Sequence, residues 1–243
     1  MNDLFTTPLL PSLLFIGLTI FLFSFISFCL KIGFRAQPKL ALLLKTELLI
    51  WITTIGALSI FGFFNKFDTV PPRFFFILAP VILLLLFTTK SKTVRPIFLS
   101  VPQTWLIGIQ SFRIVMELIL FILAKQHVAP ELMTWDGRNF DIIIGLTAPL
   151  IVYSCFTLNI FKPSIRNEIV LIWNFLGIAL LGNVVVNGFL ATPTIFQTIQ
   201  TVPENTFIGS FPYSWLPGFV VPTALFFHIM SIRKCLTDQS TKN

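Results

Sequence analysis

The sequence predicts an all-α membrane protein, a polytopic bundle of seven transmembrane helices, and two features of its composition lead to that prediction. Charged residues make up only 11% of the 243 positions, whereas soluble domains average about 25%. Hydrophobic residues make up 55%, and Phe alone occurs 29 times. A soluble domain of this size could not bury so many apolar side chains. The composition therefore excludes soluble enzymes, disordered proteins and nucleic-acid-binding proteins, although the isoelectric point is about 9.6.

Apolar runs of helix length set the number of spans. A hydrocarbon core about 30 Å thick requires roughly 20 residues of α-helix. The seven runs that approach or exceed this length are 9–31, 40–64, 72–89, 102–124, 140–161, 167–190 and 213–233. The connections between them are too short to form an extramembrane domain. Residues 1–243 are therefore expected to fold as a single integral membrane domain.

The seven runs differ in strength. The first starts almost at Met1 without a basic segment before it, and we interpret it as a retained anchor rather than a cleaved signal peptide. The third is short and contains Pro80, and the fourth contains Arg113 and Glu117. The other five runs, including the first, are stronger predictions than the third and the fourth. We retain both weaker runs because omitting either one inverts every later connection and removes the charge asymmetry between the two sides.

The distribution of Lys and Arg predicts the orientation. With the N-terminus outside, 11 of the 17 basic residues fall in cytoplasmic segments and four fall outside. Short connections rich in Lys and Arg remain in the cytoplasm, so the N-terminus is predicted outside and the C-terminus in the cytoplasm. We expect a multi-pass protein of the cell (inner) membrane. Its expected partners are the lipid bilayer and, at the cytoplasmic face, anionic lipid headgroups.

The fourth run carries a polar stripe. At 100° per residue, Gln110 and Glu117 point about 20° apart and Arg113 about 60° away, so all three share one face. An ionisable side chain in the bilayer centre costs about 2.5–3.5 kcal/mol on insertion scales, so this face is predicted to point into the bundle or a wet cavity. Arg113 and Glu117 are four residues apart, and we expect them to form an ion pair along their own helix.

The sixth run is predicted to supply the opposite wall of this polar site. Asn183 and Asn187 point about 40° apart, and Asn183 lies at a depth similar to that of Glu117. We therefore expect both side chains to face Arg113. Asn174 points about 180° from Asn183 and is predicted to be a packing or interface residue near the cytoplasmic side.

The outer connection before the fifth run is rich in polar residues. Asp136 precedes Gly137 in a turn signal, Asn139 is expected to cap the next helix, and Asp141 is an acid in its first turn. These local roles explain most of the segment. An alternative is that Asp136, Arg138, Asn139 and Asp141 form an entrance or lid above the polar stripe.

Metal and cofactor sites are not predicted. The outer connection lacks the oxygen spacing of an EF-hand calcium loop. His127 and His228 fall on opposite sides of the predicted membrane, which excludes a haem bound by both, and neither has a Cys or acid at metal-ligand spacing.

Three functions are compatible with these features. The favoured one is binding or translocation of a small polar or amphiphilic ligand through an outward-facing intramembrane polar pocket. In the second, the chain is an intramembrane enzyme acting on a lipid-linked substrate, with Glu117 as acid or base and Arg113 holding an anionic group. In the third, it is a structural or assembly subunit that packs against partner membrane subunits, and Arg113 and Glu117 lock the helices together.

Overall fold

The computed structural model describes residues 8–92 and 99–240, which contain helices and no strand. The main helices are α1 (Leu9–Gly33), α2 (Pro38–Ile60), α3 (Phe75–Lys90), α5 (Gln103–Gly108), α6 (Phe112–Lys125), α7 (Ile142–Val152), α8 (Pro163–Ala191) and α9 (Val221–Ser240). A 3-10 turn at Ile109–Ser111 joins α5 to α6, a π turn at Tyr153–Thr157 extends α7, and another at Leu216–Val220 precedes α9. The described residues thus form seven helical segments, one for each predicted run, and the all-α prediction is confirmed.

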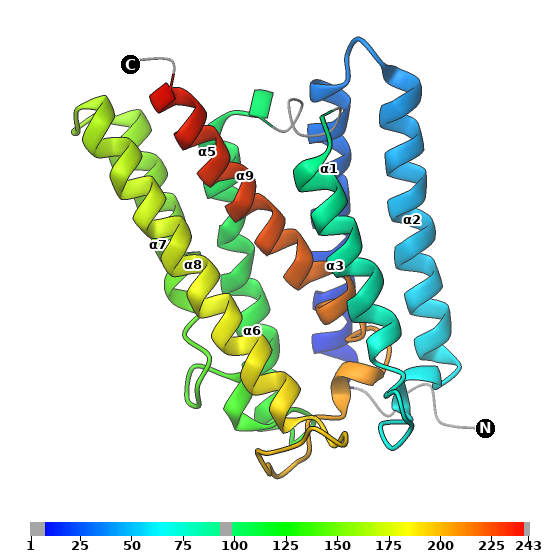
Figure 1. The fold of residues 1–243 in the computed structure, drawn as a ribbon. Coiled ribbons are helices and arrows are strands. Elements are labelled where there is room, and N and C mark those ends of the chain that lie inside the picture. The colour runs from blue at the N-terminus through cyan, green and yellow to red at the C-terminus, as the bar shows by residue number, and fades with distance from the viewer. Residues whose placement is uncertain (1–7, 93–98, 241–243) are drawn as a thin grey trace.

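Successive segments run in opposite directions (Figure 1). α1 begins at the lower end of the bundle in that view, and α9 finishes at the upper end. α9 packs most extensively against α8 and also contacts α3 and α5. The described chain therefore passes from one end of the bundle to the other seven times.

Five of the segments are long and apolar enough to cross a membrane. They are Leu9–Gly33, Pro38–Ile60, Gln103–Lys125, Pro163–Ala191 and Leu216–Thr237. The other two are shorter than predicted, since α3 has 16 residues and α7 with its π turn also covers 16. At 1.5 Å per residue, each spans about 24 Å.

The fifth segment ends earlier than the sequence predicts. The predicted run 140–161 ends in the structure at Thr157, because Asn159 adopts a left-handed conformation with φ of 49°. Such a residue ends a helix, and Pro163 then begins α8. The connection to α8 thus covers residues 158–162 rather than the predicted 162–166.

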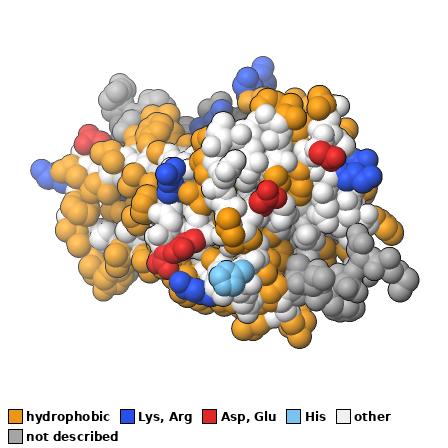
Figure 2. Space-filling model, turned by 90° about the horizontal axis from the view of Figure 1, so that it is seen from below, with side chains coloured by type: hydrophobic (Ala, Val, Ile, Leu, Met, Phe, Trp, Pro, Cys, Tyr) orange, Lys and Arg blue, Asp and Glu red, His pale blue; other side chains and the backbone are white. Residues whose placement is uncertain are grey.

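The outer faces of the helices are apolar. Leu42, Leu83, Leu150 and Ile172 each expose more than 60% of their surface. Figure 2 views the lower end of the bundle, where acidic and basic side chains are scattered and hydrophobic side chains extend around the rim. Apolar helix surfaces of this length face lipid in membrane proteins. The fold is therefore that of a multi-pass membrane protein.

The connection from α6 to α7 returns into the bundle before α7 begins (Figure 1). A Cβ built at Gly145 would lie 3.3 Å from the Cβ of Arg113, so the first turn of α7 packs beside Arg113. Arg113 precedes the end of α6 by 12 residues, or about 18 Å. Irregular backbone at such depth needs hydrogen-bond partners within the protein. Arg138 N–H donates to the Leu132 carbonyl, and Asn139 N–H donates to that of Thr134.

Candidate functional site

An ion pair between two helices lies in the centre of the bundle. Arg113 Nη1 is 2.7 Å from Asp141 Oδ1, and the two residues expose only 2% and 6% of their surface. The expected pair between Arg113 and Glu117 is therefore wrong. The returning connection brings the start of α7 to the depth of the polar stripe, and this places Asp141 against the guanidinium.

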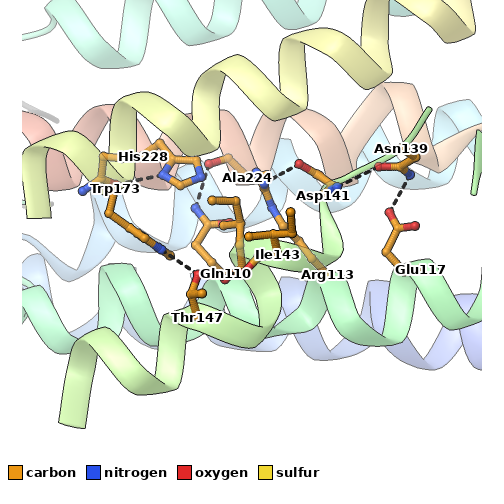
Figure 3. Close-up of polar contacts among 12 residues, drawn as sticks. Gln110, Arg113, Glu117, Asn139, Asp141, Ile143, Thr147, Trp173, Ala224 and His228 are labelled. Atoms are coloured by element: carbon orange, nitrogen blue, oxygen red, sulfur yellow. Dashed lines mark hydrogen bonds and ion pairs between the residues drawn. The ribbon is translucent and has the colours of Figure 1, made fainter. Parts of the chain in front are cut away.

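Glu117 instead binds Asn139. Asn139 Nδ2 donates to Glu117 Oε1 at 2.5 Å and to the Met133 carbonyl at 3.0 Å. Its Oδ1 accepts the backbone N–H of Asp141 at 3.0 Å, so one amide joins Glu117 to Asp141 (Figure 3). The prediction that Asn139 caps the next helix is also wrong. Asp141 holds the N-cap position of α7, and the Asn139 side chain forms a turn instead. We call Arg113, Glu117, Asn139 and Asp141 the charged cluster.

The other two predicted entrance residues lie outside this cluster. Asp136 is exposed and lies 3.5 Å from Lys125 Nζ, in a surface ion pair. Arg138 is exposed, and its carbonyl accepts a hydrogen bond from Asn183 Nδ2 at 2.6 Å. The structure therefore separates the four residues into a buried pair and an exposed pair.

The two Asn residues of α8 do not face Arg113 as predicted. Asn187 Nδ2 donates to the carbonyl and the side-chain oxygen of Asn183, at 2.8 and 2.9 Å. Because Asn183 binds the Arg138 carbonyl, both side chains are engaged at the returning connection. α8 turns Val184, Val185 and Gly188 toward the interior cavity in their place.

A cavity of about 300 Å³ adjoins the charged cluster. It lies between α3, α6, α8 and α9, and most of its lining is aliphatic or aromatic. All four residues of the charged cluster line it, together with Asn205. Val185 and Val186 also line it and are 41% and 56% exposed, so the cavity reaches the surface beside α8. The predicted polar pocket is thus an apolar cavity with one polar end.

Several polar atoms of this end have no hydrogen-bond partner within the described chain. They are Arg113 Nε and Nη2, Glu117 Oε2 and Asn205 Oδ1, and all four are buried. A buried polar atom without a partner costs about 1–3 kcal/mol, and more when it is charged. Arg113, Glu117 and Asn205 all line the cavity, so groups of both charge signs lie beside it.

Asn205 was not among the predicted site residues. It lies in the connection before α9, is fully buried, and donates through Nδ2 to the Gly188 carbonyl at 2.8 Å. A second hydrogen bond reaches Thr192 Oγ1 at 3.2 Å. No pattern in the sequence distinguishes this Asn from an ordinary loop residue, because its position depends on how the connection folds beneath α8.

The third residue of the predicted stripe, Gln110, lies between the charged cluster and the upper half of the bundle (Figure 3). Gln110 is fully buried, and its Nε2 donates to the Ala224 carbonyl at 3.0 Å. Gln110, Arg113 and Glu117 all face the interior, as helical spacing predicts. Figure 3 shows Gln110 lying between the charged cluster and His228.

A second set of polar side chains lies in the upper half, and all of them are buried except Gln103, which is partly buried. His228 Nδ1 lies 2.8 Å from Asn174 Oδ1, and Asn174 Nδ2 donates to Ser231 Oγ at 2.7 Å. Gln103 Nε2 also donates to Ser231 Oγ, at 2.6 Å. We call Gln103, Asn174, His228 and Ser231 the neutral network. It joins α5, α8 and α9 and lies outside the cavity lining.

Comparison of the chain with protein-family models, curated proteins and solved structures gave no match. The arrangement of the site therefore has to be interpreted from its own chemistry. An apolar cavity with buried hydrogen-bonding groups at one end is suited to a molecule with an apolar part and a polar part.

Proposed function

We propose that this chain crosses the inner membrane seven times, with the N-terminus outside, and binds an amphiphilic ligand in the cavity beside the charged cluster. The alternating direction of the seven segments and the excess of Lys and Arg on the cytoplasmic connections support the topology. α3 and α7 are the remaining two of the seven proposed spans. Each is short, but a lipid bilayer adapts to a modest hydrophobic mismatch between helix length and membrane thickness.

One observation favours ligand binding over a purely structural role. The cavity has a volume of about 300 Å³ and places apolar walls next to buried donors and acceptors that lack partners. This volume lies at the lower end of the range of about 300–1,000 Å³ typical of ligand pockets. A helix lock alone has no use for such a space, because tight packing stabilises a bundle better.

A second candidate function is catalysis on a lipid-linked substrate. It is favoured by the two carboxyl-bearing residues that Asn139 joins. Glu117 accepts a hydrogen bond from Asn139 Nδ2, and the backbone N–H of Asp141 donates to Asn139 Oδ1. Paired carboxyl groups in one site suit proton transfer to and from a substrate. Binding remains the better-supported function because the rest of the cavity lining is aliphatic or aromatic and suits the apolar part of a ligand.

Photo-crosslinking in native membranes tests ligand binding. A fatty acid with a photoreactive diazirine should label the wild-type chain at residues that line the cavity. Val185→Trp fills the mouth and should reduce this labelling severalfold. Ile172→Trp is the matched control, because Ile172 lies on the exposed face of the same helix and is 69% exposed. Equal labelling of the cavity residues in both variants would contradict the proposal.

Reporter fusions test the topology. A reporter that is active only in the cytoplasm should be active after Asn243 and inactive after Asp136, whereas a reporter active only outside should show the opposite pattern. Cytoplasmic activity at both positions would mean that the segments between them cross the membrane an even number of times, and would overturn the seven-span assignment.

A further inference from the structure

We propose that the ligand of the cavity has a zwitterionic head group, with an oxyanion bound by Arg113 and a primary ammonium bound by Glu117. This inference depends on the proposed ligand-binding function and goes further, because it names the chemistry of the head group. It rests on Arg113 and Glu117, two residues of opposite charge that line one cavity and have buried polar atoms without a partner in the described chain.

The oxyanion is indicated by the way Arg113 is used. Nη1 binds Asp141 Oδ1 at 2.7 Å, whereas Nε and Nη2 have no partner within the described chain. Nε and Nη2 form one edge of the planar guanidinium, and their two N–H groups are parallel. This edge matches a carboxylate or phosphate, which accepts both hydrogen bonds at once.

The ammonium is indicated by the charge balance of the cluster. Asp141 neutralises Arg113, whereas Glu117, where it is ionised, has only the neutral amide of Asn139 as a hydrogen-bond donor in the described chain, at 2.5 Å. A wholly anionic head group would therefore place its charge beside an uncompensated carboxylate. An ammonium donates to Glu117 Oε2 and offsets this charge. Asn205 Oδ1, also unpaired, is a further acceptor in the lining.

The apolar walls indicate that the head group belongs to a lipid. The lining beyond the charged cluster includes Phe74 just before α3, Leu78 within α3 and Val220 from the turn before α9. The cavity also reaches the surface at Val185 and Val186, on a helix whose outer face is apolar. An acyl chain can thus extend from the cavity into the bilayer. A phosphoethanolamine lipid combines this chain with the required head group.

Binding to the purified, delipidated full-length protein in detergent tests the inference. The probes are lysophosphatidylethanolamine, lysophosphatidylglycerol and an alkylamine, all of equal chain length. Lysophosphatidylethanolamine should bind at least about tenfold more tightly than either of the others, which corresponds to about 1.4 kcal/mol. Free phosphoethanolamine, the same head group without a chain, should bind much more weakly still.

The outcomes separate this inference from the proposed function. Equal affinity for lysophosphatidylethanolamine and lysophosphatidylglycerol, or for lysophosphatidylethanolamine and the alkylamine, would overturn the zwitterionic head group but leave amphiphile binding intact. Free phosphoethanolamine binding as tightly as the lipid would overturn the lipid assignment. Failure of every chain-bearing probe to bind would overturn the proposed function itself.

Two variants assign the two charges of the head group to residues. Glu117→Gln should remove most of the preference for lysophosphatidylethanolamine over lysophosphatidylglycerol, whereas Glu131→Gln, at an exposed acid of the same outer side, should retain it. Arg113→Lys keeps the charge but loses the two-nitrogen edge, so both phospholipids should bind at least severalfold more weakly. An unchanged preference in a folded Glu117→Gln protein would contradict the assigned role of Glu117.

Discussion

The charged cluster and the neutral network are two buried polar regions of one bundle, and they differ in what lies beside them. The charged cluster lines a cavity and contains Arg113, Glu117 and Asp141. The neutral network lies outside the cavity lining and has no formal charge when His228 is neutral. Each region contains buried atoms without a hydrogen-bond partner among the described residues, including His228 Nε2 in the neutral network. If the proposed function is correct, adjacent space, more than burial of polar groups, distinguishes the binding site from a packing contact.

The largest expected effect concerns the ion pair of the charged cluster. Arg113→Met leaves the Asp141 carboxylate buried without its partner and should lower the free energy of unfolding by about 3–5 kcal/mol. Adding Asp141→Leu removes the stranded charge and should restore most of the loss. Thermal unfolding in detergent measures both changes. If Glu117→Leu restored more stability to the Arg113→Met variant than Asp141→Leu does, the ion pair would instead lie along α6, between Arg113 and Glu117.

The neutral network should respond to packing rather than to charge. A Cβ at Gly177 would overlap the His228 ring, whereas a Cβ at Gly182 on the same helix meets nothing within 4 Å. Gly177→Ala should therefore destabilise the protein by about 1–3 kcal/mol, and Gly182→Ala should be neutral or slightly stabilising. Unfolding midpoints of the two variants give the comparison. Equal midpoints would show that α8 and α9 pack less closely at His228 than the structure has it.

A hydrogen-bond deletion in the neutral network should separate stability from binding. Ser231→Ala removes the acceptor for Asn174 Nδ2 and Gln103 Nε2, and should cost about 1–2 kcal/mol of stability. The affinity for lysophosphatidylethanolamine should not change, because Ser231 does not line the cavity. A large loss of affinity in a stably folded Ser231→Ala protein would mean that the two polar regions act together.

The sequence was sufficient for the number of helical segments and for the inward direction of Gln110, Arg113 and Glu117. Directions within one helix follow from 100° per residue, so the shared face could be predicted before any packing was known. The partner of Arg113 could not be predicted in this way. Asp141 is 28 residues away, and it reaches Arg113 only because the connection between α6 and α7 returns into the bundle.

The prediction for α8 was wrong for a related reason. The spacing of Asn183 and Asn187 correctly indicates a shared face, but rotation of a whole helix about its axis depends on what its neighbours present. In the structure, the Arg138 carbonyl needs a donor, and Asn183 supplies it at 2.6 Å. The apolar face with Val184 and Gly188 then turns toward the cavity. Hydropathy contains no information about such a backbone carbonyl.

The smallest expected effect contrasts two acids of the same connection. Asp136 lies 3.5 Å from Lys125 in a pair whose side chains are 39% and 60% exposed, whereas Asp141 lies 2.7 Å from the buried Arg113. Water already solvates the exposed pair, so Asp136→Asn should change stability by no more than about 0.5 kcal/mol. Asp141→Asn replaces a buried carboxylate and should cost several times more. The two unfolding midpoints, measured side by side and again at high salt, test this difference. A loss at Asp136 as large as that at Asp141 would mean that the exposed end of the connection, and not only its buried end, holds α7 in place.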